Sequence, residues 1–254
     1  MTVSIDDPAP QVRRLTLERP ERMNALDGPN LQALNDAVRD CAAASSDVKV
    51  LVIRGSGRAF CAGNDLKWLA SGVLADRAAH MHHQDLMQDT YERLEAAPQI
   101  VLASVNGYAV AGGFELMLAC DLAIVDEAAQ LGDEHIRRNL LPSGGSSQRL
   151  PRRLGLQRAM FYLVTGRRMT GSEALALGLA VQAVPAAQLE AATLELAKEI
   201  AQADALALAY MKQMARRSME LPLADGLRYE RWMQHCYRTQ SPSLEAGVRG
   251  FAGT

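Results

Sequence analysis

The chain has 254 residues, of which 48% are hydrophobic, 22% charged and 5% aromatic, and its formal net charge is −2. This balance gives no electrostatic basis for binding nucleic acid and no platform for stacking bases, and no apolar run reaches the roughly 18 to 20 residues of a membrane span. Together with four scattered cysteines and a polar, acidic start, it predicts a cytoplasmic protein with reduced thiols and no nucleic-acid or membrane partner.

Short β-rich runs and helical patterns alternate along the first three quarters of the chain. Residues 27–46 place apolar side chains at helical spacing behind an Asp-Gly-Pro start, which predicts a helix. The alternating run QVRRLTLERP (11–20) predicts a half-buried strand that ends at Pro20. Three more apolar runs predict buried strands: VKVLVIRGSG (48–57), QIVLASVNGYAV (99–110) and LAIVDE (122–127). This order of elements predicts an α/β fold in which helices cover the faces of sheets.

The last quarter of the chain is predicted to be helical. Thr170 and Glu173 form a capping-box pattern at the start of a helix, and Gly178 follows where that helix should end. From residue 189 onward there is no strand pattern. We therefore expect an α/β core over residues 1–188 and an all-helical segment over residues 189–254, which packs against a neighbour or covers the site.

Two stretches, 50–69 and 101–121, share one design: a buried strand, then small residues, then a helix. Glycines let a ligand approach the backbone, and the first N–H groups of a helix have no partner within it. Two such helix starts that meet would form a site for an oxyanion, whereas tight turns alone would also explain the glycines. The sequence contains no dinucleotide fingerprint, phosphate-binding P-loop or serine-hydrolase elbow.

Several side chains in the sequence can carry protons. Glu115 lies in the first turn of an otherwise apolar helix, where it either complements the helix dipole or, if buried, has a raised pKa suited to proton transfer. Asp133, Glu134 and His135 form a charged triplet of the kind that loops expose to solvent. The run HMHHQD (80–85) lacks a second pair of metal ligands, so we expect an exposed helix there and no metal site.

Five motifs, in their order along the chain, resemble those of the crotonase family, the enoyl-CoA hydratases and isomerases. They are RPERMNALD, RAFCAGNDLKWL, NGYAVAGGFELMLACD, LPSGGSSQRLPRRLG and TGRRMTGSEALALGLAVQAVP. The resemblance implies a superhelix of ββα turns with a C-terminal helical segment that builds a trimer or a dimer of trimers. It also implies an acyl-CoA thioester as the substrate, with no cofactor besides the CoA that the substrate carries.

The same resemblance implies roles for particular residues. The thioester carbonyl would bind between the backbone N–H groups of Asn64 and Gly112. The first catalytic glutamate falls on Glu115, and counting back from Pro142 places the second catalytic position on His135, where the family has glutamate. Five further residues are implied as contacts to CoA or substrate: Arg22, Met23, Ala62, Asp65 and Leu66.

With histidine at the second catalytic position, we expect a lyase that adds water to a 2-enoyl-CoA through a stabilised enolate, while Asp133 and Glu134 stay in solvent. An isomerase that uses Glu115 as its single base is the alternative within the same fold. A third hypothesis is a protein that binds CoA thioesters with degraded chemistry, because an Arg-Arg pair before LLP replaces small residues of the family.

Overall fold

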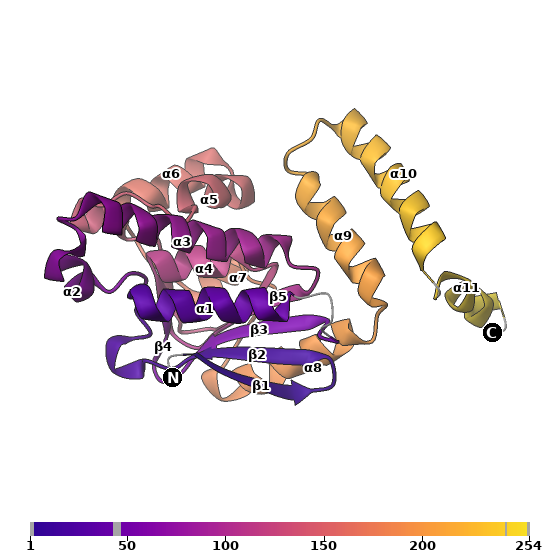
Figure 1. The fold of residues 1–254 in the computed structure, drawn as a ribbon, viewed down its shortest axis with the longest axis horizontal. Coiled ribbons are helices and arrows are strands. Elements are labelled where there is room, and N and C mark those ends of the chain that lie inside the picture. The colour runs from indigo at the N-terminus through magenta and orange to yellow at the C-terminus, as the bar shows by residue number, and fades with distance from the viewer. Residues whose placement is uncertain (1–2, 43–46, 242, 253–254) are drawn as a thin grey trace.

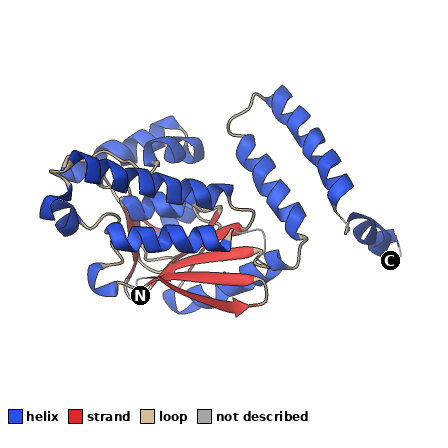
Figure 2. Cartoon of the chain, in the orientation of Figure 1, coloured by secondary structure: helices blue, strands red, loops and turns tan. Residues whose placement is uncertain are grey.

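The computed structural model describes residues 3–42, 47–241 and 243–252, and two sheets form its centre (Figure 1, Figure 2). The larger sheet has the strand order β1 (Val3–Ala9), β2 (Val12–Leu17), β3 (Val50–Gly55), β5 (Ile100–Val105), β7 (Leu122–Asp126) and β10 (Gln182–Val184). The smaller sheet has the order β4 (Ala59–Cys61), β6 (Tyr108–Val110), β8 (Gln130–Gly132) and β9 (Met169–Thr170). The pairs β1–β2 and β8–β9 are antiparallel, and the other neighbouring strands are parallel.

Helices surround these sheets and follow the chain in a regular order. They are α1 (Gly28–Cys41), α2 (Leu66–Trp68), α3 (Arg77–Ala96), α4 (Gly112–Ala119), α5 (Ser146–Leu154), α6 (Leu156–Thr165), α7 (Gly171–Ala176), α8 (Leu189–Ala201), α9 (Ala205–Arg217), α10 (Leu223–Gln240) and α11 (Leu244–Ala252). Short helical turns lie at η1 (Pro20–Arg22), η2 (Leu69–Val73), η3 (His135–Arg138) and η4 (Ala186–Gln188).

The chain repeats one unit, which consists of a strand of the larger sheet, a strand of the smaller sheet and then a helix. Strands β3 and β4 precede α3, β5 and β6 precede α4, and β7 and β8 precede α5. The turns between paired strands are tight: a Cβ atom on Gly107 would lie 2.1 Å from the carbonyl oxygen of Arg58, so glycine is required there. The ββα superhelix implied by the family resemblance is confirmed.

Strand β3 separates two hydrophobic clusters because its side chains alternate between the faces of the sheet. Leu51 and Ile53 join the main cluster, which helix α1 covers. Val50 and Val52 point the other way and join a smaller cluster that includes Ala197 of α8. Helices therefore cover both faces of the larger sheet, as expected for an α/β fold.

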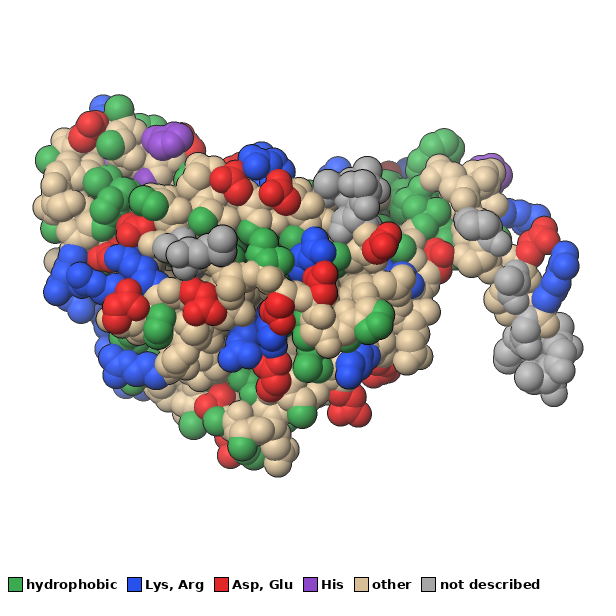
Figure 3. All heavy atoms as spheres, turned by 60° about the horizontal axis from the view of Figure 1, so that its bottom comes forward, with side chains coloured by type: hydrophobic (Ala, Val, Ile, Leu, Met, Phe, Trp, Pro, Cys, Tyr) green, Lys and Arg blue, Asp and Glu red, His purple; other side chains and the backbone are tan. Residues whose placement is uncertain are grey.

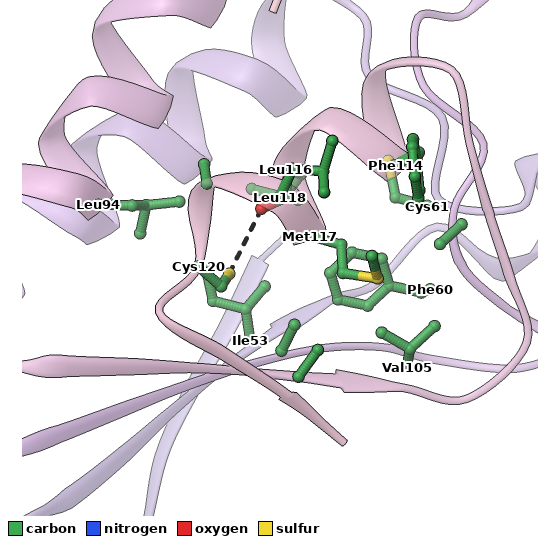
Figure 4. Packing of buried hydrophobic residues seen from close by; sticks show 14 of the residues in the cluster. Ile53, Phe60, Cys61, Leu94, Val105, Phe114, Leu116, Met117, Leu118 and Cys120 are labelled. Carbon is green, nitrogen blue, oxygen red and sulfur yellow. Dashed lines mark hydrogen bonds between the residues drawn. The ribbon is translucent and has the colours of Figure 1, made fainter. Parts of the chain in front are cut away.

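Helix α4 lies inside the main cluster, and all eight of its residues are buried. Figure 4 shows its Phe114 and Met117 among side chains of the surrounding strands, including Phe60 and Val105. A helix that is apolar all round is stable only as a buried element. Glu115, the single ionisable residue in α4, is therefore drawn into the interior by the packing of its neighbours.

The elements predicted from sequence are present with shifted ends. The four predicted strand regions contain β2, β3, β5 with β6, and β7, and the helix predicted over 27–46 is α1, capped by the side chain of Asp27. Residues 43–46 of that prediction lie outside the described residues. The capping box is confirmed, because the Thr170 hydroxyl accepts from the Glu173 N–H at 3.1 Å and the Glu173 carboxylate accepts from the Thr170 N–H at 2.7 Å.

The C-terminal helices α9, α10 and α11 extend away from the sheets (Figure 1), and they project from the body of the molecule in Figure 3. Helix α9 is anchored by Lys212, whose ammonium donates to the carbonyl oxygens of Leu94 and Gln99 and lies 2.8 Å from the Asp121 carboxylate. Helix α8, just after the boundary predicted at residue 188, packs on the larger sheet. None of the helices in the described ranges has the length and apolar character to cross a membrane.

Candidate active site

Three neighbouring parallel strands of the smaller sheet, β4, β6 and β8, end at one place. Their pairing runs from Cys61 opposite Ala109 to Val110 opposite Gly132, so the segments that follow the three strands leave the sheet side by side. In α/β proteins, ligands bind outside the carboxyl ends of parallel strands. The arrangement brings together the segments that carry Asn64, Glu115 and His135.

The loop after β4 touches the start of α4. A Cβ atom on Gly63 would lie 2.6 Å from the backbone nitrogen of Gly112, and a Cβ atom on Gly112 would lie 3.6 Å from the backbone nitrogen of Asn64. The two nitrogens predicted to hold a thioester oxygen are thus on adjoining backbone segments. Both positions depend on glycine for this close approach, because a side chain on Gly63 would force the segments apart.

Hydrogen bonds to Leu26 on both sides of Asn64 set the direction of the Asn64 N–H. The N–H of Leu26 donates to the carbonyl oxygen of Gly63 at 2.8 Å, and the N–H of Asp65 donates to the carbonyl oxygen of Leu26 at 2.9 Å. Along an extended segment successive N–H groups point to opposite sides, so the intervening N–H of Asn64 faces away from Leu26. Gly112 begins α4, and its N–H is one of those that a helix leaves without an internal partner.

Glu115 is fully buried in the first turn of α4. Its Oε1 accepts from the backbone N–H of Ser146 at 3.0 Å, while its buried Oε2 has no hydrogen-bond partner among the described residues. Burial raises the pKa of Glu115, and this effect outweighs the opposing influence of nearby His135. The burial considered for Glu115 in the sequence is therefore confirmed, and one carboxylate oxygen is held while the other is free to take a proton.

His135 lies next to Glu115 and has a second carboxylate behind it. Its Nε2 is 3.9 Å from Oε2 of Glu115, and its Nδ1 is 3.0 Å from Oδ1 of Asp133. Burial opposes a positive charge on the imidazole, but the Asp133 contact and the charge of Glu115 outweigh burial and raise the pKa of His135. The three side chains form a row, which we call the Asp133–His135–Glu115 cluster.

The expectation that Asp133 and Glu134 stay in solvent is wrong. Asp133 is 1% exposed, because the pairing of β8 with β6 carries the chain over the start of α4 directly after Gly132. Glu134 is half-buried and forms a two-point ion pair with Arg168 at 2.7 and 3.1 Å. The backbone of Glu134 has φ 54°, so the chain turns sharply there and directs the side chains on its two sides to different partners.

A network of charges connects this site to helix α9. The guanidinium of Arg149 donates to both oxygens of Glu95, at 2.8 and 2.7 Å, and to the carbonyl oxygen of Gly144 at 2.5 Å. Arg216 of α9 donates to the same Glu95 carboxylate at 2.8 Å. Gly144 lies against Glu115, since a Cβ atom on Gly144 would be 2.7 Å from Oε2. One carboxylate thus holds both the C-terminal segment and the loop beside Glu115.

Four of the predicted CoA contacts lie together beside Asn64. The Ala62 N–H donates to the carbonyl oxygen of Met23 at 3.0 Å, so η1 lies against the loop after β4. Arg22 and Leu66 are exposed, and Met23 and Ala62 are half-buried. All four residues keep some exposed surface, and their contact with CoA stays a prediction.

Asp65, the fifth predicted contact, is taken up by contacts within the protein. Its Oδ1 accepts from the N–H groups of Lys67 and Trp68, and its Oδ2 lies 3.0 Å from Arg19. Burial alone would raise the pKa of Asp65, but these N–H groups and Arg19 together lower it. The contacts give Asp65 a part in shaping the loop, and its direct contact with CoA stays a prediction.

The sequence analysis did not identify several residues that the structure places at the site. Asp133 was assigned to solvent, and Gly144 and Ser146 were noted only within a motif. His83 was expected on an exposed helix, but it is 2% exposed and lies 2.9 Å from the side chain of Asn64. No group of His, Cys, Asp or Glu side chains in the described part of the chain could hold a metal ion.

The arrangement supports chemistry that develops negative charge on an oxygen and moves one proton. Two backbone N–H groups beside each other can stabilise an oxyanion, which is worth about 3 to 4 kcal/mol per donor in enzymes. Glu115 and His135 can each accept or donate a proton, because burial raises the pKa of Glu115 and the neighbouring carboxylates raise the pKa of His135.

Comparison with known proteins identifies the family. A family model described as "Enoyl-CoA hydratase/isomerase" matches residues 9–254. A probable mitochondrial enoyl-CoA hydratase of Dictyostelium discoideum is 35% identical over 225 residues, which cover 89% of this chain and 79% of that protein. The 2,3-dehydroadipyl-CoA hydratase of Escherichia coli is 35% identical over 221 residues, covering 87% of this chain and 84% of that protein. The crystal structure of an enoyl-CoA hydratase from Bacillus anthracis superposes with a TM-score of 0.94 at 32% identity, covering 100% of this chain and 96% of that chain.

Proposed function

The chain belongs to the enoyl-CoA hydratase/isomerase family, and we propose that its site adds water to a 2-enoyl-CoA thioester with Glu115 as the base and His135 as the acid. The observation that carries this assignment is the Asp133–His135–Glu115 cluster. Hydration needs one group that takes a proton from water and another that gives a proton to carbon. An isomerase needs only a single base, so a proton donor at His135 and the buried Asp133 that supports it would not be required for its chemistry.

Glu115 has the geometry of the base. The Ser146 N–H holds one carboxylate oxygen, which favours the ionised form, and the other oxygen has no hydrogen-bond partner among the described residues. A water molecule that donates to this free oxygen would be oriented and made more nucleophilic. The raised pKa of Glu115 makes the carboxylate a stronger base than an exposed one.

His135 has the environment of the acid. Carboxylates lie on both sides of its ring, at 3.0 and 3.9 Å, and they favour the imidazolium form. Asp133 lies at Nδ1 on one side of the ring, and Nε2 on the other side lies 3.9 Å from Glu115, with its hydrogen available for transfer. The cluster then carries one net negative charge, and uptake of a proton from water by Glu115 leaves Asp133 and His135 as a neutral ion pair.

In the proposed reaction, Oε2 of Glu115 takes a proton from water while the water oxygen bonds to the β-carbon. The electrons of the double bond move onto the thioester oxygen, where the N–H groups of Asn64 and Gly112 stabilise the enolate. The enolate then takes the Nε2 proton of His135 on its α-carbon. Passage of the proton from Glu115 to His135 restores the starting state, so the sum is the addition of one water.

The test is the loss of conjugated thioester absorbance of short 2-enoyl-CoAs with the wild type, Glu115→Gln and His135→Ala. Each variant should lose about 10²- to 10⁴-fold in kcat, the usual contribution of general acid–base catalysis. Glu127→Gln, a change at an exposed carboxylate, is the matched control and should keep the wild-type rate.

The outcomes separate the three hypotheses. If 3-enoyl-CoAs isomerise with His135→Ala as fast as with the wild type, while no 2-enoyl-CoA is hydrated, the protein is an isomerase with Glu115 as its base. If the wild type binds enoyl-CoA and transforms neither substrate, it is a binding protein with degraded chemistry.

We further propose that the chain forms a trimer or a dimer of trimers, works in the cytoplasm and requires no cofactor beyond the CoA of its substrate. Support for assembly comes from large apolar side chains on α9 and α10, which stand away from the sheets in Figure 1. These are Met211 (63% exposed), Leu223 (78%), Leu227 (55%) and Trp232 (62%). The acyl-CoA would contact Arg22, Met23, Ala62 and Leu66. Sedimentation of the purified protein distinguishes one chain from three or six.

A further inference from the structure

One face of α3 lies behind both backbone donors of the oxyanion site. His83, Met87 and Tyr91 follow one another at intervals of one helical turn, and all three are buried. The Tyr91 hydroxyl donates to the carbonyl oxygen of Gly112 at 2.8 Å, and the Met87 sulfur lies 3.5 Å from where a Cβ of Gly112 would stand. His83 Nε2 lies 2.9 Å from Oδ1 of Asn64. Each donor segment therefore has its own contact from α3.

The imidazole of His83 is neutral at physiological pH. Burial lowers the pKa of His83 to about 4, with neighbouring His80 and His82 adding to this effect and Asp27 opposing it. A neutral imidazole carries one hydrogen. With the Asn64 amide oxygen facing Nε2, that hydrogen lies on Nε2 and is donated to Oδ1, while the buried Nδ1 has no hydrogen-bond partner among the described residues.

The peptide between Gly63 and Asn64 carries the N–H that would donate to the thioester oxygen. To keep this N–H in one direction, the peptide must be held at both of its ends. Gly63 has φ +80°, a conformation open to glycine, so the chain before the donor is easily turned. Leu26 holds the carbonyl end of this peptide. The contact between His83 and the Asn64 side chain is a second anchor at its other end, and the ring of Trp68, centred 4.7 Å from that of His83, packs beside it.

We propose that His83 is a positioning residue of the oxyanion hole, which holds the side chain of Asn64 and thereby fixes the direction of the Asn64 N–H. This inference rests on the proposed role of Asn64 and Gly112 as oxyanion donors. The proposal explains why the side chain at position 64 is an amide, because the oxyanion donor is a backbone N–H that any non-proline residue could supply. His83 touches no reacting atom and acts through Asn64.

The test compares His83→Ala, His83→Gln, Asn64→Ala and the double variant His83→Ala/Asn64→Ala, with His82→Ala as the exposed control on the same helix. The loss of one donor costs roughly 10²- to 10³-fold, and misdirecting it should cost less, so we expect about a tenfold lower kcat for His83→Ala. KM should change little, because the oxyanion contact strengthens in the transition state. His83→Gln retains an N–H donor and should recover most of the rate, and the double variant should be no slower than the slower single variant.

A second measurement does not require turnover. Polarisation of the thioester carbonyl by two N–H donors shifts the absorbance of bound 2,4-hexadienoyl-CoA to longer wavelength, and this shift should shrink in His83→Ala at saturating ligand. Thermal unfolding of each variant separates loss of fold from loss of alignment.

Several results would overturn the proposal: effects of His83→Ala and Asn64→Ala that multiply in the double variant, a change in KM with kcat intact, or an undiminished absorbance shift. A wild type that hydrates no enoyl-CoA yet shifts the bound dienoyl-CoA would refute the hydratase assignment alone. A wild type that gives no shift at all would refute the oxyanion hole together with the role of His83.

Discussion

Replacement of Gly144 by alanine tests whether the position of the free Glu115 oxygen controls the reaction. The new Cβ would lie 2.7 Å from Oε2 of Glu115 and 2.6 Å from Cε2 of Tyr91, whereas ordinary van der Waals contact begins at 3.4 Å. Gly144 is buried, and its backbone is not left-handed, so the conflict is with side chains and not with backbone conformation. Either the carboxylate or the loop must move by more than half an ångström.

The size of the effect follows from this displacement. A shift of about 1 Å in a catalytic group costs around 10²-fold in rate, so we expect kcat to fall about 10- to 100-fold in Gly144→Ala. Overpacking should also lower the free energy of unfolding by about 1 to 3 kcal/mol. The assay is enoyl-CoA hydration at a temperature well below the unfolding midpoint, combined with thermal unfolding of the same sample. Gly226→Ala in α10 is the matched control, because a Cβ there meets no atom within 4 Å.

Two results would contradict this account. A Gly144→Ala protein with the wild-type kcat and a lowered midpoint would show that the loop packs as described but that the position of Glu115 does not limit the reaction. Wild-type values for both quantities would show that the loop does not approach Glu115 closely in solution.

Further predictions concern the charges and the thiols. Asp133→Asn should move the alkaline limb of the kcat profile to lower pH, because the carboxylate that raises the pKa of the acid His135 is lost; a limb that stays in place refutes this role. The contact between Asp133 and protonated His135 makes its full contribution to the stability of the fold at pH values below the ordinary histidine pKa. This contribution is lost as the pH rises through the raised pKa of His135. Lys212→Met should lower the free energy of unfolding by roughly 1 to 3 kcal/mol in urea titration, since the buried carbonyl oxygens of Leu94 and Gln99 lose their donor while Asp121 keeps Arg216; an unchanged midpoint counts against it. Cys61 and Cys120, whose pKa values burial raises to about 12, should react with a thiol reagent only after unfolding, and modification of either in the native protein contradicts their burial.

Local pattern was sufficient for much of the fold and for half of the proposed catalytic pair. Alternating and continuous apolar runs predict β2, β3, β5 and β7, because the burial of a strand follows the hydrophobic pattern of its own few residues. The apolar residues on both sides of Glu115 predict its burial in the same way, and the carboxylate is 0% exposed. Each of these predictions depends on side chains within one turn or one strand of the residue concerned.

The cluster behind Glu115 could not be predicted in this way, because it depends on pairing between distant segments. Asp133 has the composition of a solvated loop, and it is buried because β8 pairs with β6, whose sequence lies more than 20 residues away. His83 is a different case. Its spacing to Met87, Tyr91 and Leu94 is that of one helical face, so the sequence does contain a pattern that predicts its burial.

The shared carboxylate of Glu95 has a consequence for protein engineering. Helix α9 is joined to the rest of the chain through Arg216 on Glu95 and Asp121 and through Lys212 on Asp121, while the same Glu95 fixes Arg149 and the Gly144 loop. The C-terminal helices therefore cannot be replaced by those of a related protein without regard to these ion pairs. A chimaera that imports a tail without a cation at position 216 would leave Glu95 half satisfied and would disturb a loop that the foreign tail never touches.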